Sequence, residues 1–244
     1  MTELPQHQVS PEATGGAGTI EEYTLGAVAL TRLLTGDLLP GLAGSPTSIG
    51  MQRRVAGNTL DDLVVRSRSS SGEVGIDFQI KRTASPTKSN TAFCDALAQC
   101  LETMDKQAKA LANGSLQLGL GASAPTGPLS ELKRLTKLAR SHPTPETFLG
   151  VLLPGATDAD VRSRFTSVRE AVAQVCADRG VTIEDDALVE LTYRFLKYLR
   201  VWIFEAEGDG RDVLEATSRL AALLPAGGPT AQQAFATLRT LAEE

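Results

Sequence analysis

The sequence has few of the residues that build disulfide frameworks and zinc sites. Its three cysteines, Cys94, Cys100 and Cys176, show no CxxC spacing, and the only histidines are His7 and His142. An odd cysteine count with two scattered histidines supports neither a paired disulfide framework nor a four-ligand zinc site. We therefore look for function among oxygen and nitrogen groups.

Long apolar runs are also missing. No uninterrupted stretch approaches the roughly 20 residues of a membrane-spanning helix, and residues 1–17 lack the basic start and apolar middle of a signal peptide. The GxxxxGKS/T pattern is absent, so no nucleotide triphosphate is bound by that device. These absences predict a cytoplasmic protein with no membrane partner.

The overall charge is acidic, but its distribution is uneven. The 244 residues are 42% hydrophobic and 22% charged, as in a globular protein, and the net charge is −5. Residues 51–90 carry seven Lys or Arg against four Asp or Glu. A local positive field can meet phosphate although the whole chain is acidic. On charge alone, a solvated basic face with no partner explains this pattern equally well.

The spacing of apolar residues in the first half predicts a mixed α/β domain over residues 19–125. Residues 1–18 are polar, contain a glycine run and predict a flexible arm. From Thr19, taken as the N-cap, apolar residues recur every three or four positions until Gly36, which is typical of a helix. Segments rich in β-forming residues then predict an antiparallel meander, followed by a helix and one more strand. These segments are 48–55, 60–66, 74–82, 92–112 and 116–120.

The second half of the sequence has a different pattern of apolar residues. After a soft boundary at residues 124–128, apolar residues recur at helical steps, with Pro and Gly between the runs. Residues 126–244 therefore predict an all-helical segment with a regulatory or oligomerisation role. Trp202 lies in one of these runs and is expected in core or subunit packing. The runs are 129–139, 159–176, 185–204, 211–224 and 231–244.

Polar side chains on one predicted strand form the strongest chemical pattern. Because strand residues alternate between faces, Asp77, Gln79 and Lys81 share one face, while the apolar residues between them take the other. Asp62 begins the preceding strand, and the turn brings it near Gln79 and Lys81. Carboxylates bind Mg²⁺, which neutralises phosphate charge and activates water, and a lysine stabilises the charge that develops. The pattern indicates phosphodiester hydrolysis.

Each part also has a plain structural explanation. A Q-x-K triplet occurs by chance on the solvated face of an edge strand, and Asp61-Asp62 can simply turn the chain into a strand. An acid in the first turn of a helix is favoured by the helix dipole, which explains Glu22. It is the order of these signals along the chain that favours a nuclease site.

The same residues resemble the PD-(D/E)xK nuclease superfamily in its Mrr-like branch, where a Q-x-K variant of the last motif occurs. The matching residues are Glu22, Asp62 and Gln79-Ile80-Lys81. The stretch Gly18-Thr19-Ile20-Glu21-Glu22-Tyr23 is similar to the opening helix of the double-stranded-DNA endonuclease domain of bacterial antiphage proteins, which fronts CBASS effectors and some STAND-type ATPases. The likeness covers about residues 15–125 and implies a restriction-endonuclease-like fold.

The resemblance implies a role for each matching residue. Asp62, Gln79, the Ile80 carbonyl and Glu22 would hold Mg²⁺, or Mn²⁺ in its place, and Lys81 would be the catalytic ammonium. Asp61 remains an alternative to Asp62. Gln79 stands where many relatives carry an acid, so it adds no charge and metal binding should be weaker. Basic residues expected to contact DNA phosphates are Arg53, Arg54, Arg82 and Lys88, with Arg66 and Arg68 as further candidates.

The resulting expectation is a Mg²⁺-dependent endonuclease that cleaves double-stranded DNA as an effector of antiphage defence. Its expected partners are further copies of itself or a fused or associated sensor-ATPase module. One alternative is a catalytically inactive DNA-binding or assembly module on the same fold, with Gln79 marking the loss of activity. Another is a helical interaction protein carrying a small α/β cap.

Overall fold

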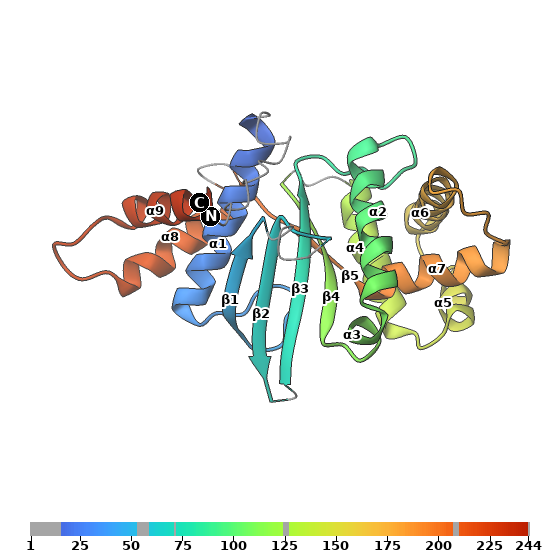
Figure 1. Ribbon diagram of the computed structural model, residues 1–244, viewed down its shortest axis with the longest axis horizontal. Coiled ribbons are helices and arrows are strands. Elements are labelled where there is room, and N and C mark those ends of the chain that lie inside the picture. Colours follow the sequence, from blue (N-terminus) through green and yellow to red (C-terminus); the bar gives the residue numbers. More distant parts are fainter. Residues whose placement is uncertain (1–15, 53–58, 71, 124–126, 207–209, 244) are drawn as a thin grey trace, which may run out of the picture.

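The computed structural model describes residues 16–52, 59–70, 72–123, 127–206 and 210–243, which form one mixed sheet with helices on both faces (Figure 1). This confirms the predicted mixed α/β class with a largely helical C-terminal segment. The strands are β1 (Ser45–Met51), β2 (Leu63–Ser69), β3 (Gly72–Lys81), β4 (Leu116–Ala122) and β5 (Leu199–Ile203). The helices are α1 (Gly16–Thr35), α2 (Thr91–Lys106), α3 (Ala108–Ala112), α4 (Gly127–Ser141), α5 (Pro145–Val151), α6 (Ala159–Asp178), α7 (Asp185–Tyr198), α8 (Arg211–Leu223) and α9 (Ala231–Glu243).

The sheet follows the chain in order, β1-β2-β3-β4-β5. The first three strands are antiparallel, so the predicted meander is confirmed. β4 runs parallel to β3, and β5 runs parallel to β4. The connection from β3 to β4 passes through α2 and α3, because a parallel neighbour requires a crossover. The carboxyl ends of β3, β4 and β5 therefore lie at one edge of the sheet.

Two apolar cores lie on opposite faces of the sheet. On one face, Ile76, Phe78 and Ile80 of β3 pack with buried residues of α1, α8 and α9. On the other, Leu118 and Leu120 of β4 pack with residues of α2, α4, α6 and α7. In Figure 1 the sheet stands between these two groups of helices. Because side chains alternate along β3, Asp77 and Gln79 lie on the face of the sheet that is covered by α2, α4, α6 and α7.

Gly119 allows β3 and β4 to share the first core. A Cβ atom at Gly119 would lie 2.2 Å from the Phe78 ring, so a side chain there would expel that ring. Phe78 in turn lies 5.9 Å from the ring of Trp202, measured between centroids. The glycine on β4 thus lets an aromatic contact form between β3 and β5.

The prediction of an all-helical second half is wrong at one place. Residues 199–203, expected inside a helix over 185–204, form β5 beside β4. Their side chains alternate between the two cores, with Leu199 and Val201 in one and Trp202 in the other. Burial on both faces favours a strand here. Trp202 is a core residue, as expected.

Smaller differences concern element ends. The first helix begins at Gly16 rather than after Thr19, and it stops at Thr35 because Gly36 takes a positive φ of 72°. The short helix α5, which begins after a capping box at Thr144, was not predicted. Most of the predicted N-terminal arm, residues 1–15, lies outside the described residues, as do residues 124–126 of the predicted boundary.

No helix in the described part of the chain is long and apolar enough to cross a membrane. Cys94, Cys100 and Cys176 are all free thiols. Burial raises the pKa of the Cys100 thiol to about 12. Cys100 and Cys176 are buried and contribute to packing.

Candidate functional site

Asp62 and Gln79 each lie one residue beyond the last pair of the β2–β3 ladder. That pair is Leu63 with Phe78, so Asp62 precedes it on one strand and Gln79 follows it on the other. Asp62 is buried, and its Oδ2 accepts a hydrogen bond of 2.6 Å from the backbone N–H of Ile80. That bond fixes the carboxylate against the end of β3.

Gln79 carries an unsatisfied oxygen at this position. The residue is 2% exposed, and its Oε1 is buried without a hydrogen-bond partner in the structure. A buried acceptor without a donor costs about 1–3 kcal/mol, and such costs are accepted at functional sites or are relieved by an ion or water. The Gln79 oxygen is therefore available to accept a hydrogen bond from water or to coordinate a cation.

Lys81 is half-buried at the last position of β3. Strand alternation places it on the same face as Gln79 and Asp77, and its register partner on β4 is Ala122. The structure thus brings Asp62, Gln79 and Lys81 to one end of the sheet. In open α/β sheets, ligands bind outside the carboxyl ends of parallel strands, which is where Lys81 lies.

The helix α1 brings a second acid to this edge, and it is Glu21. Its Oε1 forms a 3.2 Å ion pair with Nε of Arg82, and Ser123 after β4 also hydrogen-bonds to it. Its Oε2 is buried and has no hydrogen-bond partner. Burial raises the pKa of Glu21, while Arg82 and Ser123 lower it. Glu22, the residue implied by the resemblance, is half-buried and lies close enough to Tyr23 to raise the pKa of its hydroxyl.

The donors suit a hard cation. Asp62 supplies a carboxylate, Gln79 an orphaned amide oxygen and Ile80 a backbone carbonyl, and Mg²⁺ takes oxygen ligands while keeping several waters. Within the described ranges, no group of three or more His, Cys, Asp or Glu is placed to hold a metal. A site built on Gln79 needs no such group, because an amide replaces one of the acids. The residues fit Mg²⁺ with few protein ligands.

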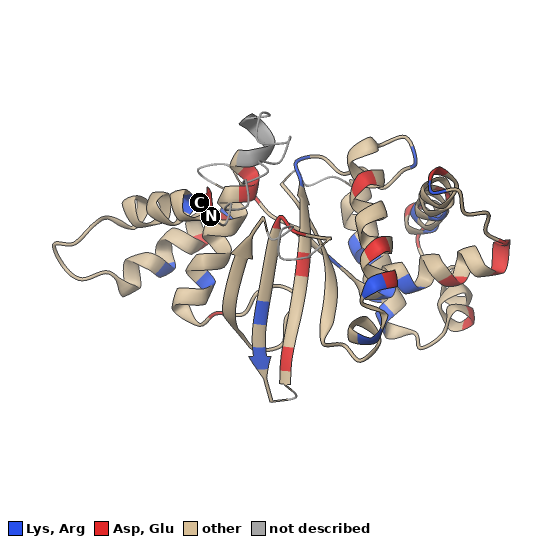
Figure 2. Cartoon of the chain, viewed as in Figure 1, with Lys and Arg blue, Asp and Glu red and all other residues tan. Residues whose placement is uncertain are grey.

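The basic residues expected to contact DNA are dispersed. Arg82 is exposed but paired with Glu21, and Lys88 forms a 3.2 Å ion pair with Glu170 of α6. Arg53 and Arg54 lie outside the described residues. Figure 2 shows basic residues on β2 beside acidic residues on β3, farther along the sheet. They include Arg66, whose guanidinium is paired with Asp77.

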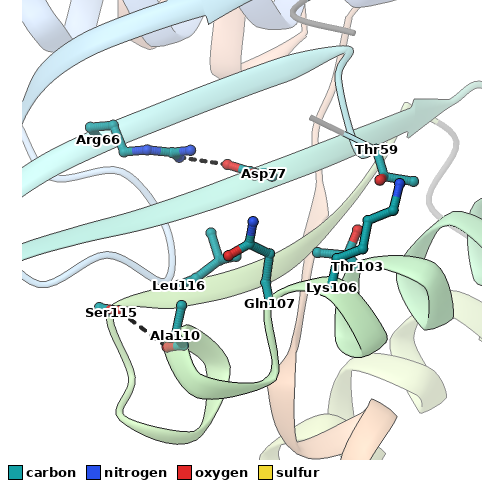
Figure 3. A pocket seen from close by; sticks show the side chains of 9 residues that line it. All are labelled: Thr59, Arg66, Asp77, Thr103, Lys106, Gln107, Ala110, Ser115 and Leu116. Atoms are coloured by element: carbon teal, nitrogen blue, oxygen red, sulfur yellow. Dashed lines mark hydrogen bonds and ion pairs between the residues drawn. The ribbon is translucent and has the colours of Figure 1, made fainter. Parts of the chain in front are cut away.

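A cavity of about 210 Å³ opens on the same face as Gln79, between the sheet and α2 (Figure 3). Asp77 lines it with its partner Arg66, and Lys106 reaches toward Thr59 across the opening. Burial raises the pKa of Asp77, although Arg66 opposes the shift. Asp77 is thus engaged in an ion pair and does not face the cation site as a free acid.

Two groups in this region were not singled out from the sequence. Glu21 could have been found only by asking which helix face meets β3, because Glu21 and Glu22 are adjacent acids. The Arg66–Asp77 pair could have been found from the meander, since Val64 opposite Asp77 leaves Arg66 two positions along the same face.

Comparisons with known proteins identify no family for this chain. No family model matches the chain, and no curated protein matches it. One solved structure, described as a Moraxella osloensis Cap4 SAVED/CARF-domain containing receptor, overlaps it with a TM-score of 0.44 and 12% identity. The overlap covers 94% of this chain and 43% of that chain. It is too loose to carry an argument about function.

Proposed function

We propose that this chain hydrolyses phosphodiester bonds of double-stranded DNA with the help of Mg²⁺. The observation that supports the proposal is the hydrogen bond of the Asp62 carboxylate to the backbone N–H of Ile80, the residue that lies between Gln79 and Lys81. Oxygen ligands beside an ammonium are what cleavage of a phosphodiester requires. The resemblance of these residues to the Q-x-K nucleases supports the same activity.

Each residue has a defined task in this proposal. Mg²⁺, when bound, would supply positive charge next to the phosphate and would polarise and orient a bound water for attack. Asp62 holds the cation with an orientation fixed by the Ile80 N–H, and the Gln79 oxygen and Ile80 carbonyl complete the protein side. Lys81 brings a point charge to the phosphate oxygens as negative charge builds on them. Arg82 lies next in the chain and is partly neutralised by Glu21.

The proposed biological role is that of an effector in bacterial antiphage defence. It rests on the resemblance of residues 15–125 to the nuclease domains of such systems. A nuclease of this kind is held inactive until infection, and a weak affinity for DNA serves that purpose. Clustering of several copies, or attachment to a sensor-ATPase module, would then raise the effective concentration of sites on one duplex.

Cleavage of supercoiled plasmid tests the proposal. The wild-type protein with Mg²⁺ should nick or linearise the plasmid, EDTA should stop it, and Lys81→Ala should slow it by a factor of about 10² or more. Lys109→Ala is the matched control, because Lys109 is an exposed lysine of the short helix α3. Equal rates for Lys81→Ala and Lys109→Ala would rule out the assigned role of Lys81.

A second candidate function is a catalytically inactive DNA-binding or assembly module. It is favoured by the neutral amide of Gln79 and by the lack, among described residues, of a cluster of acidic and histidine ligands. Gln79→Glu separates the candidates, because it restores a charge to the proposed cation site. Tighter Mn²⁺ binding by Gln79→Glu, measured by calorimetry, supports a cation site, whereas no binding by either protein favours the inactive module.

A further inference from the structure

Gln52 has an unusual backbone conformation. It follows the last residue of β1, and its φ is 47°, the one positive φ of a non-glycine residue in the described part of the chain. Side chains seldom adopt this left-handed region, and residues held there often mark a functional constraint. The interactions of Gln52 show what holds it.

Gln52 connects α1 to Asp62. Its backbone N–H donates a long hydrogen bond, 3.4 Å, to the carbonyl oxygen of Asp62. Its side chain lies near the hydroxyl of Tyr23 on α1 and acts to lower the pKa of that hydroxyl. Asp62 in turn holds the Ile80 N–H through its carboxylate. A continuous series of contacts therefore runs from Tyr23 through Gln52 and Asp62 to the end of β3.

The part of α1 that follows Tyr23 is closely packed. One turn further along α1, a Cβ atom at Gly26 would lie 2.8 Å from Cβ of Ala242 on α9 and 3.0 Å from the Met51 sulfur. Burial raises the pKa of the Tyr23 hydroxyl, and the nearby carboxylates of Glu243 and Glu22 raise it further. The hydroxyl is therefore neutral across the physiological range.

We propose that Tyr23 and Gln52 are positioning residues that fix Asp62 for cation binding. This inference rests on the proposed function, because it assigns Asp62 to the cation. Neither residue contacts the phosphate in this assignment, and both act through Asp62. Partners that orient a metal ligand in this way are worth about 10–100-fold in metal affinity or activity.

The test uses two variants. Tyr23→Phe removes only the hydroxyl, and Gln52→Gly removes the side-chain amide while glycine adopts a positive φ without a steric penalty. Tyr193→Phe is the control, since its hydroxyl donates to the carbonyl of His142 far along the chain. Hydrogen exchange of the Ile80 amide by NMR reports directly on Asp62, with no need for metal or activity. Calorimetric titration with Mn²⁺ and plasmid cleavage are the second and third measurements.

We expect both variants to speed Ile80 exchange about tenfold or more and to weaken Mn²⁺ binding about 10–100-fold, with the control unchanged. Gln52→Gly should keep or raise the thermal midpoint, because it relieves the backbone strain, so loss of positioning will not coincide with loss of stability. Ile80 exchange equal to that of the wild type, or equally fast in Tyr193→Phe, overturns the inference. A wild type that neither binds Mn²⁺ nor cuts DNA, with Ile80 responding as expected, refutes the hydrolase and supports the Tyr23–Gln52–Asp62 link.

Discussion

The buried carboxylate of Asp62 is the hydrogen-bond acceptor of the Ile80 backbone amide, at 2.6 Å. One side chain therefore both closes the β2–β3 ladder and belongs to the candidate site. Structural and functional effects of changing it can be separated, because the two tasks need different properties. The ladder needs an acceptor, whereas a cation needs a charge.

We predict that Asp62→Ala lowers the free energy of unfolding by about 1–3 kcal/mol, because the buried N–H of Ile80 loses its acceptor. Asp62→Asn retains an oxygen there and should cost about 1 kcal/mol, yet it should abolish Mg²⁺-dependent cleavage as completely as alanine does. Urea unfolding and plasmid cleavage measure the two effects. Asp61→Asn is the neighbouring control, and loss of cleavage in that variant alone would move the ligand role to Asp61.

The pH dependence of stability should reveal Asp77. Burial raises the pKa of Asp77 above its ordinary value of 3.8, and the hydrogen bond and charge of Arg66 offset only part of the shift. A carboxyl whose folded pKa is raised binds its proton more tightly in the native state. Its contribution to stability is therefore largest below the unfolded pKa and falls as the pH rises through the folded pKa.

An asparagine at position 77 cannot titrate. We therefore predict that the free energy of unfolding of Asp77→Asn increases relative to that of the wild type as the pH rises above about 4, and that the difference then becomes constant. Urea unfolding of both proteins between about pH 3 and pH 7 provides the comparison. If the stability of the wild type instead increases relative to that of the variant over this pH range, the ion pair with Arg66 lowers the Asp77 pKa by more than burial raises it.

The packing of Trp202 predicts that both halves of the chain unfold together. Its ring lies 5.9 Å from that of Phe78 and 6.4 Å from that of Phe204, with the Arg32 guanidinium 5.7 Å from its centroid. Trp202→Ala should cost about 3–5 kcal/mol, measured by far-UV circular dichroism in urea. In the wild type, the fluorescence of this single tryptophan should change at the same urea concentration as the circular dichroism. Two separate transitions would instead indicate independent halves.

Much of the fold could be predicted because local periodicity reports burial. The alternation from Ile76 to Lys81 gave β3 its correct faces, since one face meets the core beneath α1 and the other meets α2. The helix α6 was placed within a few residues of its ends, whereas the segment predicted as one helix over 92–112 divides at Gln107 into α2 and α3. In β3 and α6 the pattern along the chain matches the environment around it.

The strand β5 shows where this approach stops. Residues 199–203 follow the helix α7 without a Gly or Pro, so their apolar residues continue what looks like a helical pattern. They are buried on both faces, and a short strand of that kind has no distinctive period. The run Leu199-Arg200-Val201-Trp202-Ile203, rich in β-forming residues, was the available signal.

At the candidate site, the sequence identified the residue types but not all of their partners. Asp62, Gln79 and Lys81 are expected near one another, and the hydrogen bond from the Ile80 N–H brings Asp62 to the end of β3 that carries the other two. The choice between Glu21 and Glu22 depends on how α1 is rotated over the sheet, which adjacent acids cannot reveal. The conformation of Gln52 is likewise set by contacts with Tyr23 and Asp62 from distant parts of the sequence.

Because β5 comes from the second half of the chain, β4 is an interior strand only while that half is present. A fragment ending near residue 125 would present the polar backbone groups of β4 to other molecules and would uncover Leu118 and Leu120 as well. Such a fragment invites intermolecular strand pairing. Any shortened version of the chain should therefore keep residues 199–203, which form β5, together with β4.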